Sequence, residues 1–164
     1  MTEIYFKDPR KSNFLYEHDE NLDFFIQLHK SKKFPKVLMM SGEKGIGKFT
    51  LINHFLVSIF DKDSYDFKVK SFKVDSSFYK QYLNNTFSNI IYLKGDNFKN
   101  IKIDDIRELK SLILKSSFSN RERYIIFDNI ENFSNNSLNA LLRIIEEPLS
   151  NNNFILINNK TKPL

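Results

Sequence analysis

Three of the four glycines in this chain fall within six positions, and a lysine follows the last of them. Their spacing is G-x-x-x-x-G-K, which forms a phosphate-binding loop between a strand and a helix. Glycines let successive backbone N–H groups turn toward one anion, and the lysine adds a charge for the β and γ phosphates. We therefore predict that residues 42–50 bind phosphate. The segment comprises Gly42, Glu43, Lys44, Gly45, Ile46, Gly47, Lys48, Phe49 and Thr50.

The position after Lys48 departs from this pattern. A serine or threonine there would give its hydroxyl to Mg²⁺, but the chain has Phe49. Thr50 is one residue further along the expected helix, which turns its side chain by about 100°. We expect Thr50 to point away from the metal, so Mg²⁺ would lose a direct ligand.

A second group needed for hydrolysis is also replaced. Residues 124–129 read as four apolar residues followed by Asp128 and Asn129. Asp128 is placed to hold Mg²⁺ directly or through water. In an active ATPase with such a loop and strand, a glutamate follows the aspartate and takes the proton of the attacking water. Asparagine can orient a water but cannot accept its proton. Loss of a general base lowers a rate by about 10²–10⁴, so we expect little or no turnover.

The elements that would position these residues alternate along the chain. Apolar periodicity predicts helices over residues 19–31, 48–60, 103–114 and 134–148. Short apolar runs predict buried strands over residues 36–41, 89–95, 123–129 and 153–159. Residues 66–74 read as a hairpin or an irregular insertion without an assigned function. The alternation indicates an open α/β sheet with parallel strands.

The sequence also predicts where some of the helices begin and end. Asp19 is expected to cap the first helix, and Asp104 and Asp105 to favour the dipole of the third. The last helix is expected to begin after Ser134 and to stop at Pro148. Its inward stripe is predicted to contain Leu138, Leu141, Leu142 and Ile145.

Composition sets further limits. The 164 residues suit one domain, and 41% apolar residues are enough for a core. A net charge of +5 permits weak, non-specific DNA binding but does not require it. The absence of cysteine excludes disulfides and thiolate metal sites, and His18, His29 and His54 show no metal spacing, so no metal is predicted. His54 is expected to have a packing or surface role. We expect a cytoplasmic protein without a signal peptide or membrane span.

Four segments together resemble a known family. Residues 38–56, 101–110, 123–148 and 153–158 follow the order and spacing of the AAA+ module of bacterial clamp-loader subunits, most closely the delta prime type. The resemblance covers residues 14–160. Residues 139–148, N-A-L-L-R-I-I-E-E-P, are its most specific part, because nucleotide kinases and GTPases with the same loop do not normally carry them.

The resemblance implies a P-loop NTPase (AAA+) fold and a place in a ring of subunits. Such a ring contains gamma/tau-type and delta subunits, and it opens the sliding clamp and places it on primed DNA. Delta prime is its non-hydrolysing member, which agrees with Phe49 and Asn129. An active gamma/tau-type ATPase and another P-loop ATP-binding enzyme are the alternatives, and Mg²⁺-dependent turnover that requires Lys48 would favour them.

The resemblance also assigns positions. Residues 42–50 match Walker A, Asp128 and Asn129 match Walker B, and Asn158 or Asn159 matches sensor 1, with an ordinary strand-end loop as the alternative for the two asparagines. Glu146, Glu147 and Pro148 match the family's helix end and are expected to be structural. The cysteine-bound zinc insert is missing, so no zinc is expected.

Three further expectations concern the extent of the chain and its ligand. The lid and collar domains and the arginine that acts on a neighbour's ATP would follow residue 164. Residues 1–164 are therefore expected to be an N-terminal AAA+ ATPase-like fragment. ATP or phosphate could still occupy the loop, but nucleotide binding is expected to be weak or absent.

Overall fold

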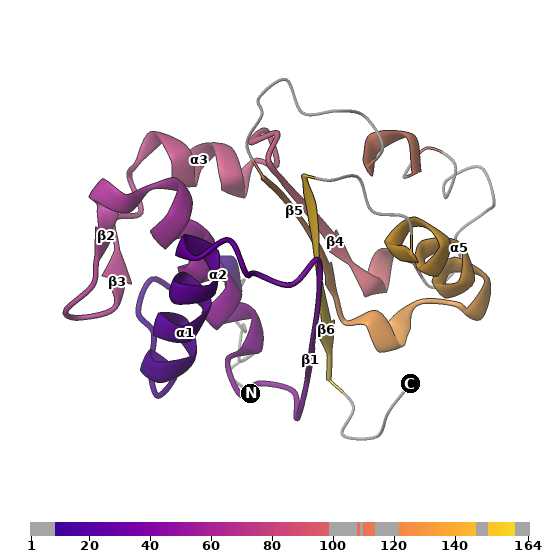
Figure 1. Ribbon diagram of the computed structural model, residues 1–164, viewed down its shortest axis with the longest axis horizontal. Coiled ribbons are helices and arrows are strands. Elements are labelled where there is room, and N and C mark those ends of the chain that lie inside the picture. The colour runs from indigo at the N-terminus through magenta and orange to yellow at the C-terminus, as the bar shows by residue number, and fades with distance from the viewer. Residues whose placement is uncertain (1–8, 99–107, 109, 114–121, 147–150, 160–164) are drawn as a thin grey trace, which may run out of the picture. The chain divides into compact units, whose positions relative to one another are not determined.

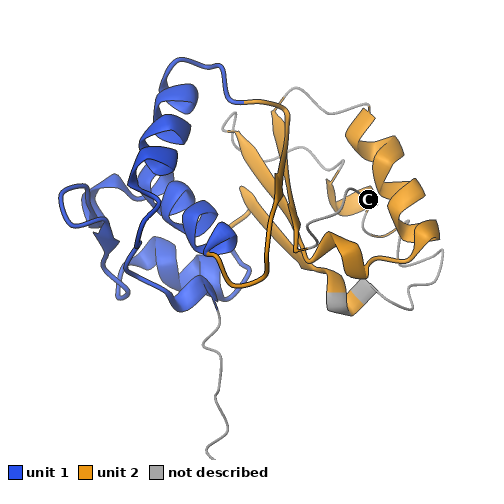
Figure 2. Ribbon diagram, turned by 90° about the horizontal axis from the view of Figure 1, so that it is seen from below, with its two compact units in different colours: residues 1–34, 47–86 blue, residues 35–46, 87–164 orange. Residues whose placement is uncertain are grey.

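The computed structural model describes residues 9–98, 108, 110–113, 122–146 and 151–159. The chain forms two compact units. Unit 1 comprises residues 1–34 and 47–86, and unit 2 comprises residues 35–46 and 87–164 (Figure 2). Each unit is described by itself. No helix within the described ranges is long and apolar enough to cross a membrane.

Unit 2 contains a four-stranded sheet (Figure 1). Its strands are β1 (Val37–Ser41), β4 (Ile90–Lys94), β5 (Arg123–Asp128) and β6 (Asn152–Asn158), in the order β1-β6-β5-β4. All neighbouring strands run parallel, so their carboxyl ends meet at one edge. The predicted open parallel sheet is thereby confirmed.

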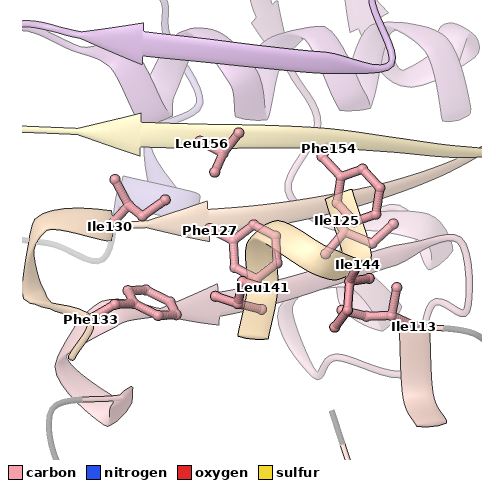
Figure 3. Packing of buried hydrophobic residues seen from close by; sticks show 9 residues of the cluster. All are labelled: Ile113, Ile125, Phe127, Ile130, Phe133, Leu141, Ile144, Phe154 and Leu156. Atoms are coloured by element: carbon pink, nitrogen blue, oxygen red, sulfur yellow. The ribbon is translucent and has the colours of Figure 1, made fainter. Parts of the chain in front are cut away.

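The core of unit 2 lies between this sheet and α5 (Asn135–Glu146) (Figure 3). Phe127 of β5 and Phe154 of β6 stack with ring centroids 6.4 Å apart, and Leu141 and Ile144 come from the helix. Each such buried side chain contributes roughly 1.5–3 kcal/mol. The cluster comprises Ile113, Ile125, Phe127, Ile130, Phe133, Leu141, Ile144, Phe154 and Leu156.

The four strands are not equally buried. Every residue of β5 and β6 is buried, as predicted, because these strands lie in the middle of the sheet. The prediction of a buried strand was wrong for β1, where Val37 is 40% and Met39 47% exposed. β4 is only partly buried along most of its length. Both lie at an edge of the described sheet, where neighbours cover less of each side chain.

Helix α5 follows the predicted capping but not the whole predicted stripe. The Ser137 N–H donates to the Ser134 Oγ at 3.2 Å, as expected for a capping serine. Leu142 is 50% exposed, so its predicted inward position was wrong, and Ile144 is buried instead. Leu141 and Ile144 define the inward direction, and Leu142 is turned about 100° away from Leu141. Glu147 and Pro148 lie outside the described residues, as do Asp104 and Asp105.

Unit 1 contains three α-helices and a small hairpin within its described part. The helices are α1 (Asp19–Lys30), α2 (Lys48–Phe60) and α3 (Ser77–Leu83). The hairpin joins β2 (Tyr65–Asp66) to β3 (Ser71–Phe72), which decides between the two alternatives for residues 66–74. Helix α3 was not predicted.

Aromatic rings join α1 to α2 within unit 1. The Phe34 and Phe55 rings stack 4.9 Å apart, and Phe25 meets both edge-on. The capping prediction for α1 was wrong: His18 occupies the N-cap position, Asp19 is the first helical residue, and no side chain makes a capping bond. His54 of α2 is fully buried, which confirms a packing role.

Candidate phosphate-binding site

The predicted phosphate-binding loop connects the two units. Residues 42–46 follow β1 in unit 2, and residues 47–50 open α2 in unit 1. Gly45 has φ +94° and Gly47 φ +88°, conformations that L side chains rarely adopt. Gly47 is the N-cap residue of α2, and the Leu51 N–H makes a backbone bond to its carbonyl at 2.9 Å. Glycines therefore occur where the backbone must turn into the helix.

The first turn of α2 carries the three side chains that follow Gly47. Lys48 is buried, at 5% exposed, and Thr50 is half-buried. Phe49 is 6% exposed and belongs to the apolar core. A phenyl ring has no oxygen to offer, so this position supplies no metal ligand.

Asp128, at the end of β5, lies in a buried and hydrogen-bonded position. It is 7% exposed, and its Oδ2 accepts a hydrogen bond from the Tyr92 hydroxyl at 2.8 Å. Burial raises the pKa of Asp128 above its ordinary value, and the charge of Glu131 adds to the rise. The bonds from Tyr92 and from the Asn129 N–H, and the charge of Lys94, act in the opposite direction on this pKa. The carboxylate is thus costly to ionise and already has a tyrosine partner.

Asn129 follows Asp128 in the left-handed conformation, with φ 56° and ψ 51°. Asparagine tolerates this conformation better than most residues. Its Oδ1 accepts a hydrogen bond from the Asn159 Nδ2, and the Asn159 N–H donates to the Glu131 Oε2 at 3.1 Å. The chain after β5 is therefore tied to the chain after β6.

Sequence reasoning missed two residues that shape this edge of the sheet. A Cβ on Gly95 would overlap the carbonyl oxygen of Asn129 and lie 2.9 Å from its carbonyl carbon, so only glycine fits there. Tyr92 is the other missed residue. Gly95 was visible as the fourth glycine, at the end of a predicted strand, but nothing in the sequence linked either residue to Asp128 or Asn129.

The two asparagines predicted as alternatives for sensor 1 differ in their contacts. Asn159 contacts Asn129, as described above. Asn158 is buried at the end of β6, in register with Ser41, which precedes the loop. Asp128, Asn129, Asn158 and Asn159 thus lie at the carboxyl edge of one sheet, as the predicted topology requires.

The loop residues have a backbone that suits a tight turn and no metal-binding oxygen after Lys48. Gly45 and Gly47 allow a tight turn, and nothing lies within 4 Å of a Cβ on Gly45, which leaves that side of the backbone open. The position after Lys48 offers no oxygen to a magnesium ion, because it holds Phe49. Within the described ranges no three His, Asp or Glu residues are grouped to hold a metal.

The parallel sheet, the helices and the glycine loop define the α/β fold of P-loop NTPases of the AAA+ class. A DNA polymerase III gamma subunit-related protein from Thermotoga maritima shares this fold, with a TM-score of 0.51 and 17% identity over 84% of this chain and 38% of its own. PCH-2 of C. elegans has a TM-score of 0.53 and 15% identity over 96% of this chain and 42% of its own. At these identities the likeness shows the fold alone.

Sequence comparison gives the family. A family model described as "DNA polymerase III, delta subunit" matches residues 17–164. The DNA polymerase III subunit delta' of Buchnera aphidicola subsp. Schizaphis graminum is 30% identical over 138 residues, which are 80% of this chain and 39% of that relative. The chain belongs to the delta prime family of DNA polymerase III clamp-loader subunits, as the motifs indicated. It spans less than half the length of the curated relatives it matches.

Proposed function

We propose that this chain is the nucleotide-site module of a non-hydrolysing clamp-loader subunit of the delta prime type. In this role it acts in bacterial DNA replication, where the loader places the sliding clamp on primed DNA. Its direct partners are the gamma/tau-type and delta subunits, and it meets the clamp and the DNA through the complex. Membership of the delta prime family supports the loader role.

The observation that carries the non-hydrolysing role is the polar arrangement at the end of β5. Asp128 is buried against the Tyr92 hydroxyl, and the amide oxygen of the next residue, Asn129, accepts from Asn159. An amide cannot take a proton from an attacking water. A second, independent loss is Phe49, which stands where a magnesium-binding hydroxyl belongs.

The ligand left to such a site is a phosphate group or ATP held by residues 42–50 without turnover. In an assembled loader, hydrolysis then takes place at the sites of other subunits. This module then takes part in the complex as a binding surface and does not itself hydrolyse ATP.

The non-hydrolysing role is tested by phosphate release from Mg²⁺-ATP with the purified full-length protein. We expect no release above that of Lys48→Ala, and no effect of Lys44→Ala, an exposed lysine of the same loop that serves as the matched control. Turnover that only Lys48→Ala abolishes would instead identify an active gamma/tau-type ATPase or another P-loop enzyme.

The loader role is tested separately by assembly. The full-length protein is co-expressed with the gamma/tau-type and delta subunits of the same genome and purified through a tag on one of them. We expect a stable complex that loads the clamp on primed DNA, and a complex that forms and loads equally well without this protein would contradict the role.

A further inference from the structure

Residues 13–15 extend the small sheet of unit 1 beyond the hairpin. Phe14 forms an antiparallel bridge with Ser71 of β3, on the side of β3 that does not pair with β2. The Leu15 N–H donates to the Lys70 carbonyl at 3.0 Å, and the second β3 residue donates at 3.2 Å to the carbonyl of the residue before Phe14. In this antiparallel pattern the N–H and the carbonyl of Phe14 point away from β3. Neither has a hydrogen-bond partner within the described residues, so the strand edge is open at Phe14.

Aromatic side chains lie along this edge and beside it. Phe14, Tyr16 and Phe24 are all exposed, Tyr16 most of all at 77%, whereas Leu15 is buried. Phe24 belongs to α1 and follows an aspartate whose carboxylate pairs with the Lys70 ammonium, so this part of α1 lies beside the hairpin. Proteins usually protect an edge strand with charges, a proline or a bulge. This edge instead carries two exposed rings, which a further strand would partly cover.

The charge beside the edge is negative, although the whole chain carries +5. Glu17, Asp19 and Glu20 are exposed and form no ion pair within the part of the chain that the structure describes. Burial raises the pKa of Tyr65 in β2, and the charges of Asp19 and Asp23 add to the rise, so these carboxylates lie near the hairpin. The helix dipole favours Asp19 and Glu20, but Glu17 precedes α1 and lacks this explanation. The edge therefore complements a basic partner.

We propose that residues 13–16 bind an extended segment of a partner protein in which apolar residues alternate with Lys or Arg. The segment pairs with the Phe14 N–H and carbonyl as an added strand, its apolar side chains cover the exposed rings, and the neighbouring carboxylates attract its cations. Lys11 and Lys68 are exposed in the same unit and limit the affinity. The surface does not include the phosphate-binding loop, so the inference goes beyond the proposed function.

The test is titration calorimetry of the full-length protein with a synthetic peptide of about eight residues that alternates valine with lysine. A peptide that alternates valine with glutamate is the matched control, and we expect it to bind about tenfold more weakly or less. Phe14→Pro removes the outward N–H and keeps both hydrogen bonds to β3, whereas Phe14→Val keeps the N–H. We expect Phe14→Pro to weaken binding of the basic peptide about tenfold and Phe14→Val to retain most of it.

Charge reversal gives a test that does not change the strand itself. Glu17→Lys combined with Glu20→Lys should weaken binding of the basic peptide about tenfold. Asp63→Lys, at an exposed acid between α2 and β2, is the matched control and should bind like the wild type. The Phe14 amide should also become protected from hydrogen exchange when the basic peptide binds, and thermal melting should show that the variants remain folded.

Three results would overturn the proposal. The first is the absence of binding at millimolar basic peptide, and the second is equal affinity of the wild type for the basic and the acidic peptide. The third is a dimer of the full-length protein that Phe14→Pro dissociates, since the edge would then pair with a second copy of this chain. None of these results bears on hydrolysis, which phosphate release tests separately.

Discussion

His54 in unit 1 and Asp128 in unit 2 are both buried ionisable side chains, and they differ in how burial affects their charge. In unit 1, the His54 Nε2 donates to the Ser12 carbonyl at 3.2 Å, and its Nδ1 accepts from the Tyr65 hydroxyl at 3.0 Å. Burial lowers the pKa of His54 to about 4. In unit 2, burial raises the pKa of Asp128. His54 is thus neutral at pH 7 with both nitrogens satisfied, whereas the Asp128 carboxylate is held in a place that disfavours its charge.

The difference suggests why each residue is present. The His54 network joins α2 to the residues before α1 and to the hairpin, which is sufficient reason for a buried histidine. Burial disfavours the charge of Asp128, and buried carboxyl groups with raised pKa values are concentrated at functional sites. We therefore infer that Asp128 reflects the nucleotide-site ancestry of unit 2, while His54 serves packing.

The largest expected effect is that of Gly95→Ala in unit 2. The added methyl group would overlap the Asn129 carbonyl, which is backbone and cannot rotate away. We expect a loss of about 3 kcal/mol in the free energy of unfolding, measured by urea denaturation. Gly45→Ala is the matched control, because its Cβ meets nothing within 4 Å, and backbone strain alone should cost about 1 kcal/mol. Equal losses in the free energy of unfolding for the two variants would show that the Gly95 α-carbon does not lie close to the Asn129 carbonyl.

The pH dependence of unit 1 gives the next largest effect. Between pH 6.5 and 4 the unfolded chain binds a proton at His54 that the folded chain does not, so stability falls as the pH is lowered. The loss attributable to His54 is at most about 3 kcal/mol. The measurement is the free energy of unfolding at several pH values for the wild type and His54→Gln. Parallel curves for the two proteins would mean that His54 does not titrate in this range.

A smaller effect is expected when the tyrosine partner of Asp128 is removed. Tyr92→Phe deletes the hydroxyl that donates to the Asp128 Oδ2 and should destabilise the protein by about 1–2 kcal/mol at pH 7. The pKa of Asp128 should rise further, because this bond lowers it. Tyr124→Phe is a suitable control on β5, since the Glu122 carboxylate it contacts is only half-buried and water can replace the bond. A loss of stability for Tyr124→Phe that equals or exceeds that of Tyr92→Phe would contradict this expectation.

Local signals were sufficient for much of this fold. The glycine spacing located the turn into α2, Ser134 located the start of α5, and continuous apolar runs identified β5 and β6. The failures came from information that is not local. The exposure of Val37, Met39 and Leu142 depends on what packs beside them, and the contacts of Gly95, Tyr92 and Phe14 join residues that are distant in sequence.

The smallest expected effect tests the cost of the Asp128 charge itself. Asp128→Asn keeps a side-chain oxygen that can accept the hydrogen bond from Tyr92, but the amide group cannot ionise. Because the folded pKa of Asp128 is raised, the folded state of the wild type holds its proton more tightly than the unfolded state, and its stability falls as the pH rises through that pKa. At pH 8 we expect Asp128→Asn to be as stable as the wild type or more stable by up to about 1 kcal/mol, with the difference shrinking toward pH 4.

The measurement is again urea denaturation, here at pH 8, 6 and 4.5. A variant that is clearly less stable than the wild type at pH 8 would mean that Tyr92, Lys94 and the Asn129 N–H together more than offset the burial. Asp128 would then be a stabilising residue like His54, and the contrast between the two units would no longer point to a nucleotide-site origin.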